Sequence, residues 1–124
     1  MPTATQTTTY RITVYTGDID NAGTDADVFI TLFGKNGMSS GERMIDNADD
    51  NFERGKVDVF QLELQQLGDL QAIRIRHDNS GSYPGWFLEK IVIEGEGKEW
   101  TFPANRWLAY TSAPYAIDAV LPVA

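Results

Sequence analysis

The 124-residue chain contains no cysteine, and its basic residues are few. The absence of cysteine excludes disulfide bonds, thiolate metal sites and cysteine nucleophiles, although it fits any cellular compartment. Ten lysines and arginines stand against 18 aspartates and glutamates, which gives a formal net charge of −8. Such a surface repels nucleic-acid phosphates and anionic lipid headgroups. We therefore expect no nucleic-acid partner, and an anionic partner would need a bridging cation.

The N-terminal segment also lacks features of a targeting sequence. Residues 1–9 have neither the basic start and apolar run of a signal peptide nor the length of a transmembrane helix. We expect residues 1–9 to form a flexible leader and residues 10–124 to form one monomeric domain. A chain of this length, with 42% hydrophobic residues, can bury a single core.

Alternating apolar and polar residues predict an all-β fold. Most predicted strands are followed by glycine, asparagine or aspartate turn signals, and no segment has a sustained helical period. The best helix candidate, residues 65–70, contains Gly68 and is expected to be a turn. Eight short segments are predicted as strands of a β-sandwich: 10–15, 28–33, 42–45, 57–64, 72–77, 86–94, 99–102 and 115–121.

Three predicted loops contain most of the residues that could bind a ligand. They are residues 21–27, 46–51 and 77–81, and all are rich in aspartate, asparagine and glycine. Calcium takes six to eight oxygen ligands from such side chains and from backbone carbonyls. The same residues are also the favoured turn formers, so composition alone leaves both interpretations open.

The first loop does not fit the helix–loop–helix calcium motif. Asp18 and Asp20 resemble its start, but Ala22 stands where a ligand is required. Phe29 occupies the position of the bidentate glutamate, and the segment continues into a predicted strand. Any calcium site must therefore be assembled from several loops.

Five segments, in order, resemble the PLAT domain family (polycystin, lipoxygenase, alpha-toxin). Together they extend from Tyr10 to about Leu108 and cover most of the chain. They read GTDADV (23–28), DN followed after three residues by NFERGKVDVF (46–60), IRHDNSG (75–81), PGWFL (84–88) and WTFPANRWL (100–108).

The resemblance implies an eight-stranded antiparallel β-sandwich of two four-stranded sheets, without catalytic activity. It also implies two calcium sites at one end. The first would use the side chains of Asn21 and Asp78 with the carbonyls of Gly23 and Asn79. The second would use the carbonyl of Thr24 with the side chains of Asp46, Asn47, Asp49 and Asn51, assisted by Asp25.

The chain departs from the family pattern at three of these positions. Members with strong sites often have aspartate where this chain has Asn21 and Asn51, and each replacement removes a formal charge. Fewer charges weaken calcium binding. Asp49, where the family often has glycine, would compensate in part.

Other singular residues have simpler interpretations. His77 shares strand parity with Ile73 and Ile75, and no Gly-x-Ser-x-Gly motif is present, so we expect a core-edge histidine and no catalytic centre. The three tryptophans are expected to pack in the core. Met38 and Tyr83 lie in glycine- and serine-rich loops and are candidates for contact with a membrane or a protein partner.

These observations lead to one functional hypothesis and two rivals. The leading hypothesis is a calcium-binding, non-catalytic module that docks to a membrane or lipid surface. The first rival is a protein–protein adaptor in which calcium is structural or absent. The second is a carbohydrate-binding module, for which a planar row of aromatic side chains is not evident in the sequence.

Overall fold

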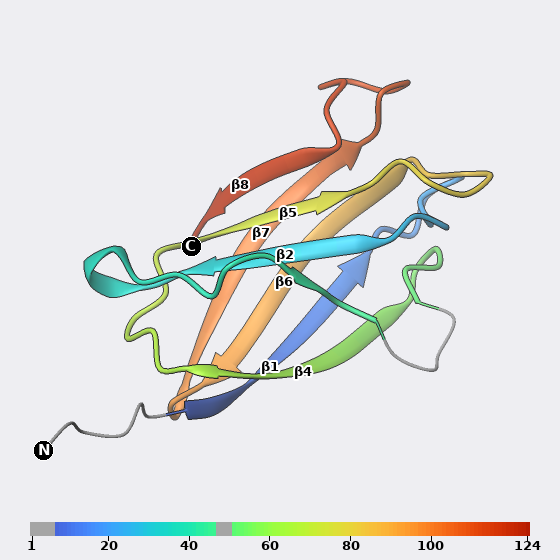
Figure 1. Ribbon diagram of the computed structural model, residues 1–124. Helices are drawn as coiled ribbons and strands as arrows, with labels where there is room; N and C mark the ends of the chain where they lie inside the picture. The colour runs from blue at the N-terminus through green and yellow to red at the C-terminus, as the bar shows by residue number, and fades with distance from the viewer. Residues whose placement is uncertain (1–6, 47–50) are drawn as a thin grey trace, which may run out of the picture.

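The computed structural model describes residues 7–46 and 51–124 as a sandwich of two antiparallel β-sheets (Figure 1). The predicted fold class is therefore confirmed. The strands are β1 (Thr7–Thr16), β2 (Val28–Phe33), β3 (Arg43–Met44), β4 (Val57–Gln65), β5 (Ala72–His77), β6 (Trp86–Gly95), β7 (Lys98–Leu108) and β8 (Asp118–Pro122), with one 3-10 turn, η1 (Lys35–Gly37).

Each sheet contains four strands, and their order determines which loops lie together. One sheet has the order β4-β1-β6-β7 and the other β3-β2-β5-β8. Tyr15 pairs with Val57 and Lys90, while Val28 pairs with His77. Consequently residues 17–27, 45–46, 51–56, 78–85 and 109–117, which connect the strands, lie at one end of the sandwich, which we call the acidic end (Figure 1). The connections 34–42, 66–71 and 96–97 lie at the opposite, far end.

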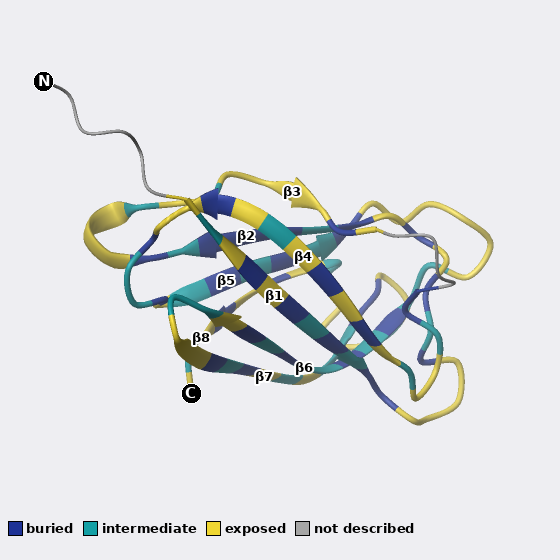
Figure 2. Cartoon of the chain, turned by 90° about the horizontal axis from the view of Figure 1, so that it is seen from below, coloured by how far each residue is buried: buried dark blue, intermediate teal, exposed yellow. Residues whose placement is uncertain are grey.

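The core lies between the sheets because most strands alternate buried residues with more exposed ones (Figure 2). Tyr10, Ile12 and Val14 of β1 are fully buried, as are Ile73 and Ile75 of β5. Below the acidic end, the ring of Phe52 packs on Phe60 and Trp86 with centroid distances of 5.5 and 5.3 Å. A cluster of three aromatic side chains therefore lies beneath the acidic loops.

Two strands are longer than the sequence pattern predicts. β1 begins at Thr7, so that Thr7–Thr9, assigned above to the leader, pair with β4. β7 extends to Leu108 and includes Pro103, which has no backbone N–H. An edge strand such as β7 tolerates proline because one of its sides has no neighbouring strand that needs a hydrogen-bond donor. In the part of the chain that the structure describes, no helix is long and apolar enough to cross a membrane.

Candidate functional site

Backbone and side-chain hydrogen bonds connect the loop between β1 and β2 to the loop between β5 and β6. Thr24 is buried, and its hydroxyl donates to the carbonyl oxygen of Pro84 at 2.5 Å while accepting from the N–H of Ala26 at 3.1 Å. The N–H of Asp25 donates to the carbonyl of Tyr83 at 3.3 Å. Gly81, with a φ of +80°, lets the two loops approach each other closely, since a Cβ atom at this position would lie 2.9 Å from the Cβ atom of Asp25.

The loop between β3 and β4 is fixed against the same segment by Phe52. This residue has a φ of 62°, which is unusual for an aromatic side chain and costs on the order of 1–3 kcal/mol. Its N–H donates to the buried carboxylate of Asp58 at 2.8 Å, and its carbonyl accepts from Thr24 at 3.0 Å. A Cβ at Gly23 would lie 3.0 Å from that carbonyl oxygen, so a larger residue would have to push the Phe52 backbone away by a few tenths of an ångström.

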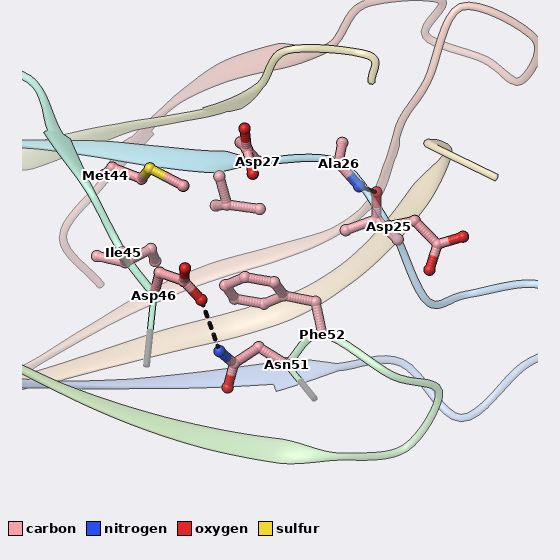
Figure 3. A pocket seen from close by; sticks show the side chains of 10 residues that line it. Asp25, Ala26, Asp27, Met44, Ile45, Asp46, Asn51 and Phe52 are labelled. Atoms are coloured by element: carbon pink, nitrogen blue, oxygen red, sulfur yellow. Dashed lines mark hydrogen bonds between the residues drawn. The ribbon is translucent and has the colours of Figure 1, made fainter. Parts of the chain in front are cut away.

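Residues 24–28, from the first of these loops, and residues 44–46 and 51–52, around the loop between β3 and β4, line an open cavity of about 200 Å³ at the acidic end (Figure 3). Thr24, Asp25, Asp46 and Asn51, all members of the second predicted calcium set, line it. The amide Nδ2 of Asn51 faces the Asp46 carboxylate at 3.4 Å, a long hydrogen bond. The structure therefore brings four residues of this set into one cavity.

Asn51 also contains an orphaned polar atom. Its side chain is 9% exposed, and its amide oxygen has no hydrogen-bond partner among the described residues. Leaving a buried acceptor without a partner costs about 1–3 kcal/mol. Carboxylate and amide oxygens are the ligands that calcium prefers, so the chemistry of this donor set fits a calcium ion.

The carboxylates around the cavity are not gathered for coordination. Asp25, Asp27 and Asp46 point in different directions in Figure 3. Across residues 7–46 and 51–124, no three histidine, aspartate or glutamate side chains are grouped closely enough to hold a metal ion. Asn47 and Asp49 of the predicted set lie outside the described residues.

Two side chains of the first predicted calcium set have different surroundings. Asn21, with φ of 62°, lines a second cavity of about 340 Å³ beside Tyr83 and Trp107. Asp78 lines neither cavity, and its Oδ1 accepts from the N–H of Asp27 at 3.2 Å and from the N–H and hydroxyl of Ser80 at 3.1 and 2.5 Å. The hydrogen bond from the Ser80 hydroxyl lowers the pKa of Asp78.

The acidic end contains both paired and unpaired carboxylates. Arg54 pairs with Asp18 at 3.1 Å and with Asp20 at 2.9 Å, and Lys56 lies 3.4 Å from Asp58. Asp25, Asp27 and Asp78 form no ion pair with any described residue. This end therefore retains negative charge.

Two predicted contact residues occupy opposite ends of the sandwich. Tyr83 is 78% exposed at the acidic end. Met38 follows β2 at the far end and packs, half-buried, against the core, so it does not lie beside Tyr83. Its neighbours Gly37, Ser39 and Ser40 indicated an exposed loop, but Met38 donates its N–H to Lys35, and its side chain turns inward.

Sequence reasoning missed several residues at the acidic end. Asp27 lines the first cavity, and its spacing from Asp25 in the first acidic loop could have identified it. Tyr110 and Tyr115, in the loop before β8, are 58% and 65% exposed, and Ile19 is 41% exposed. Trp107 is only half-buried, outside the core, and packs edge-on against Phe87 at 5.4 Å.

His77 is a structural residue, as its strand parity predicts. It is fully buried, with Nε2 2.6 Å from the Leu108 carbonyl and Nδ1 accepting from the N–H of Asn79 at 3.0 Å. Nδ1 must therefore lack a proton, and Nε2 donates. Burial lowers the pKa of His77 below 6.5, which keeps the ring neutral near pH 7.

Comparisons with known proteins agree with this architecture. The sequence pattern of the PLAT/LH2 domain matches residues 10–121. Lipoxygenase homology domain-containing protein 1 of Mus musculus is 53% identical over 102 residues, covering 81% of this chain and 5% of that protein. Polycystin-1-like protein 3 of Mus musculus is 43% identical over 103 residues, which again cover 81% of this chain and 5% of that protein.

Solved structures give the same result. Coral 8R-lipoxygenase, whose structure is described in terms of calcium activation through a C2-like domain, is 28% identical. It superposes with a TM-score of 0.80 over 93% of this chain and 17% of that chain. The chain spans only a small part of these longer relatives. On the match across residues 10–121, the chain belongs to the PLAT/LH2 domain family.

Proposed function

We propose that this chain is a non-catalytic, calcium-binding module that docks to a membrane or lipid surface through its acidic end. The observation that carries the proposal is the orphaned, buried amide oxygen of Asn51, a residue that lines the same cavity as Asp46 and Asp25. The calcium-activated coral lipoxygenase supports it, because its C2-like domain is similar to this chain in sequence and fold.

The residues at this end have distinct roles in the proposal. Asp46 and Asn51, with the carbonyl of Thr24, would hold calcium, and Asp25 would assist. A bound calcium ion supplies positive charge that a lipid phosphate can share. Without it, the unpaired carboxylates Asp25, Asp27 and Asp78 repel anionic headgroups.

Exposed apolar side chains at the same end would contact the lipid interface. Ile19, Tyr83, Tyr110 and Tyr115 extend from three of the four loops. Tyrosine favours a membrane interface because its ring enters the apolar region while its hydroxyl stays hydrated.

The test combines calcium titration with vesicle sedimentation. Wild type should release or absorb heat at or below about 1 mM calcium, and Asp46→Asn should bind at least about tenfold more weakly. Asp69→Asn is the matched control, because Asp69 lies at the far end and pairs there with Lys98. Its calcium affinity should equal that of wild type.

In the second part, vesicles of phosphatidylserine and phosphatidylcholine should pellet the protein with calcium but not with a chelator. Tyr83→Ser should reduce pelleting and leave the calcium titration unchanged. Absence of calcium binding in wild type would reject the metal site, and calcium binding without pelleting would reject docking alone.

A further inference from the structure

The outward face of the sheet β4-β1-β6-β7 divides into two chemically different halves. Register places its outward side chains in rows that cross all four strands. Nearest the acidic end, one row contains Val57, Tyr15, Lys90 and Pro103, and the next contains Val59, Thr13, Val92 and Thr101. We call these two rows the apolar half-face. Phe87 and Trp107 continue it toward the acidic end.

The other half of the same face has the polar surface expected of a solvated antiparallel sheet. Its first row contains Gln61, Arg11, Glu94 and Glu99. The apolar half-face, in contrast, contains no carboxylate in either row. Val57 and Val59 are 49% and 38% exposed, so both side chains present apolar surface to the solvent.

Lys90 is the single cation of the apolar half-face. Its ammonium lies 4.6 Å from the centre of the Tyr15 ring and forms no ion pair with a described residue. The nearest carboxylate in sequence is Glu89, at the register shift between Leu88 and Lys90. In a chain of net charge −8, an unpaired lysine surrounded by valine, threonine and tyrosine provides a specific site for a carboxylate of another molecule.

We propose that the apolar half-face is a docking surface for a protein partner that presents apolar side chains around a carboxylate positioned to pair with Lys90. Strand spacing and rise give the two rows an area on the order of 300 Å², below the roughly 800 Å² per partner of a stable interface. The half-face would thus form the centre of a larger contact.

A second copy of this chain and a membrane fit the half-face less well. A two-fold dimer centred here would bring Lys90 near its own copy, and like charges oppose that arrangement. A lipid surface is attracted by clusters of basic residues or by protruding apolar tips, whereas this face is a flat sheet with one lysine.

Site-specific photo-cross-linking in the cells that make the protein tests the proposal. The photoreactive residue p-benzoylphenylalanine replaces Val57 in the half-face or, as the control, Glu63 on the outward side of the same strand. We expect a discrete protein adduct from position 57 only. Lys90→Glu should lower its yield about tenfold, and Arg11→Glu, on the polar half, should not.

A carboxylate-to-lysine change in the cross-linked segment of the partner should restore the adduct with Lys90→Glu. Equal adducts from positions 57 and 63, no discrete adduct from 57, or no charge dependence would overturn the proposal. So would an adduct formed by a second copy of the chain. Lys90→Glu is also tested on phosphatidylserine vesicles with calcium, the condition in which wild type is expected to pellet. Unchanged pelleting is expected, and a fall with unchanged calcium affinity would mark this face as lipid-binding and overturn the proposal.

Discussion

A buried polar group at each end of the sandwich shows a difference in hydrogen bonding. At the far end, the hydroxyl of Tyr10 donates to Glu96 at 2.6 Å and accepts from the N–H of Leu67 at 3.0 Å. At the acidic end, the amide oxygen of Asn51 has no partner among the described residues, and Phe52 keeps a φ of 62°. Positive φ occurs at both ends, since Glu96 at the far end has a φ of 53°. The difference therefore lies in hydrogen bonding: the Tyr10 hydroxyl is satisfied, whereas the acidic end retains an amide oxygen that a ligand can use.

The largest expected effect is at the far end. Tyr10→Phe removes the hydroxyl that holds Glu96 and leaves the N–H of Leu67 without its acceptor. We expect the free energy of unfolding, measured in urea with chelator, to fall by about 2 kcal/mol. Calcium affinity should not change. A loss of calcium binding in this variant would show that the two ends are not independent.

A smaller loss is expected from Thr24→Val at the acidic end. Valine keeps the shape of threonine but removes the hydrogen bonds to Pro84 and from Ala26. We expect destabilisation by about 1–2 kcal/mol in chelator, together with weaker calcium binding, because the loops are less well positioned. Thermal unfolding and calcium titration measure both effects. Full calcium affinity in this variant would contradict the proposed role of the loop contacts.

Asn51→Leu should separate stability from ligand binding. Leucine has a similar size and removes the orphaned oxygen, so the free energy of unfolding in chelator should stay constant or rise by up to about 1 kcal/mol. Stabilisation by calcium should disappear. The control is Gln61→Leu, on the exposed side of β4, which should respond to calcium like wild type. A clear loss of stability in chelator would show that Asn51 is structural.

The pH dependence of stability provides a smaller test, visible only in alkali. Burial, together with the hydrogen bond to Glu96, raises the pKa of Tyr10 from 10.0 to about 12. Below pH 10 the hydroxyl is protonated in both states, so its contribution is complete. Between pH 10 and 12 the unfolded chain loses this proton first, and stability falls. The difference between wild type and Tyr10→Phe should therefore narrow over this range; a constant difference would argue against the raised pKa.

Strand periodicity predicted the sandwich because most strands bury one face. It failed where other interactions determine the structure. The threonines of Thr7–Thr9 resemble a leader but join β1 because β4 supplies partners. β7 passes through Asn105, with φ of 49°, and this irregularity interrupts the alternation on which the prediction depends. Trp107 was expected in the core but lies on the outer face for the same reason.

The candidate site was predictable as a set of loops but not as a geometry. Aspartate, asparagine and glycine identified residues 21–27, 46–51 and 77–81, and the strand order brings the described residues of these loops to one end. Composition could not show that Asp78 holds its own loop through Ser80 or that the Asn51 oxygen is buried without a partner. Those facts depend on side-chain directions, which a single sequence does not encode locally.

The most direct measurement is residue-resolved amide hydrogen exchange with calcium and with chelator. The central claim is that calcium binds at the acidic end and leaves the far end unchanged. Calcium should slow exchange at Thr24, Phe52 and Asp27 and leave Leu67 and Lys35, whose N–H groups bond to Tyr10 and to Leu67 at the far end, unaffected. Unchanged exchange at the acidic end, or equal slowing at both ends, would contradict the account.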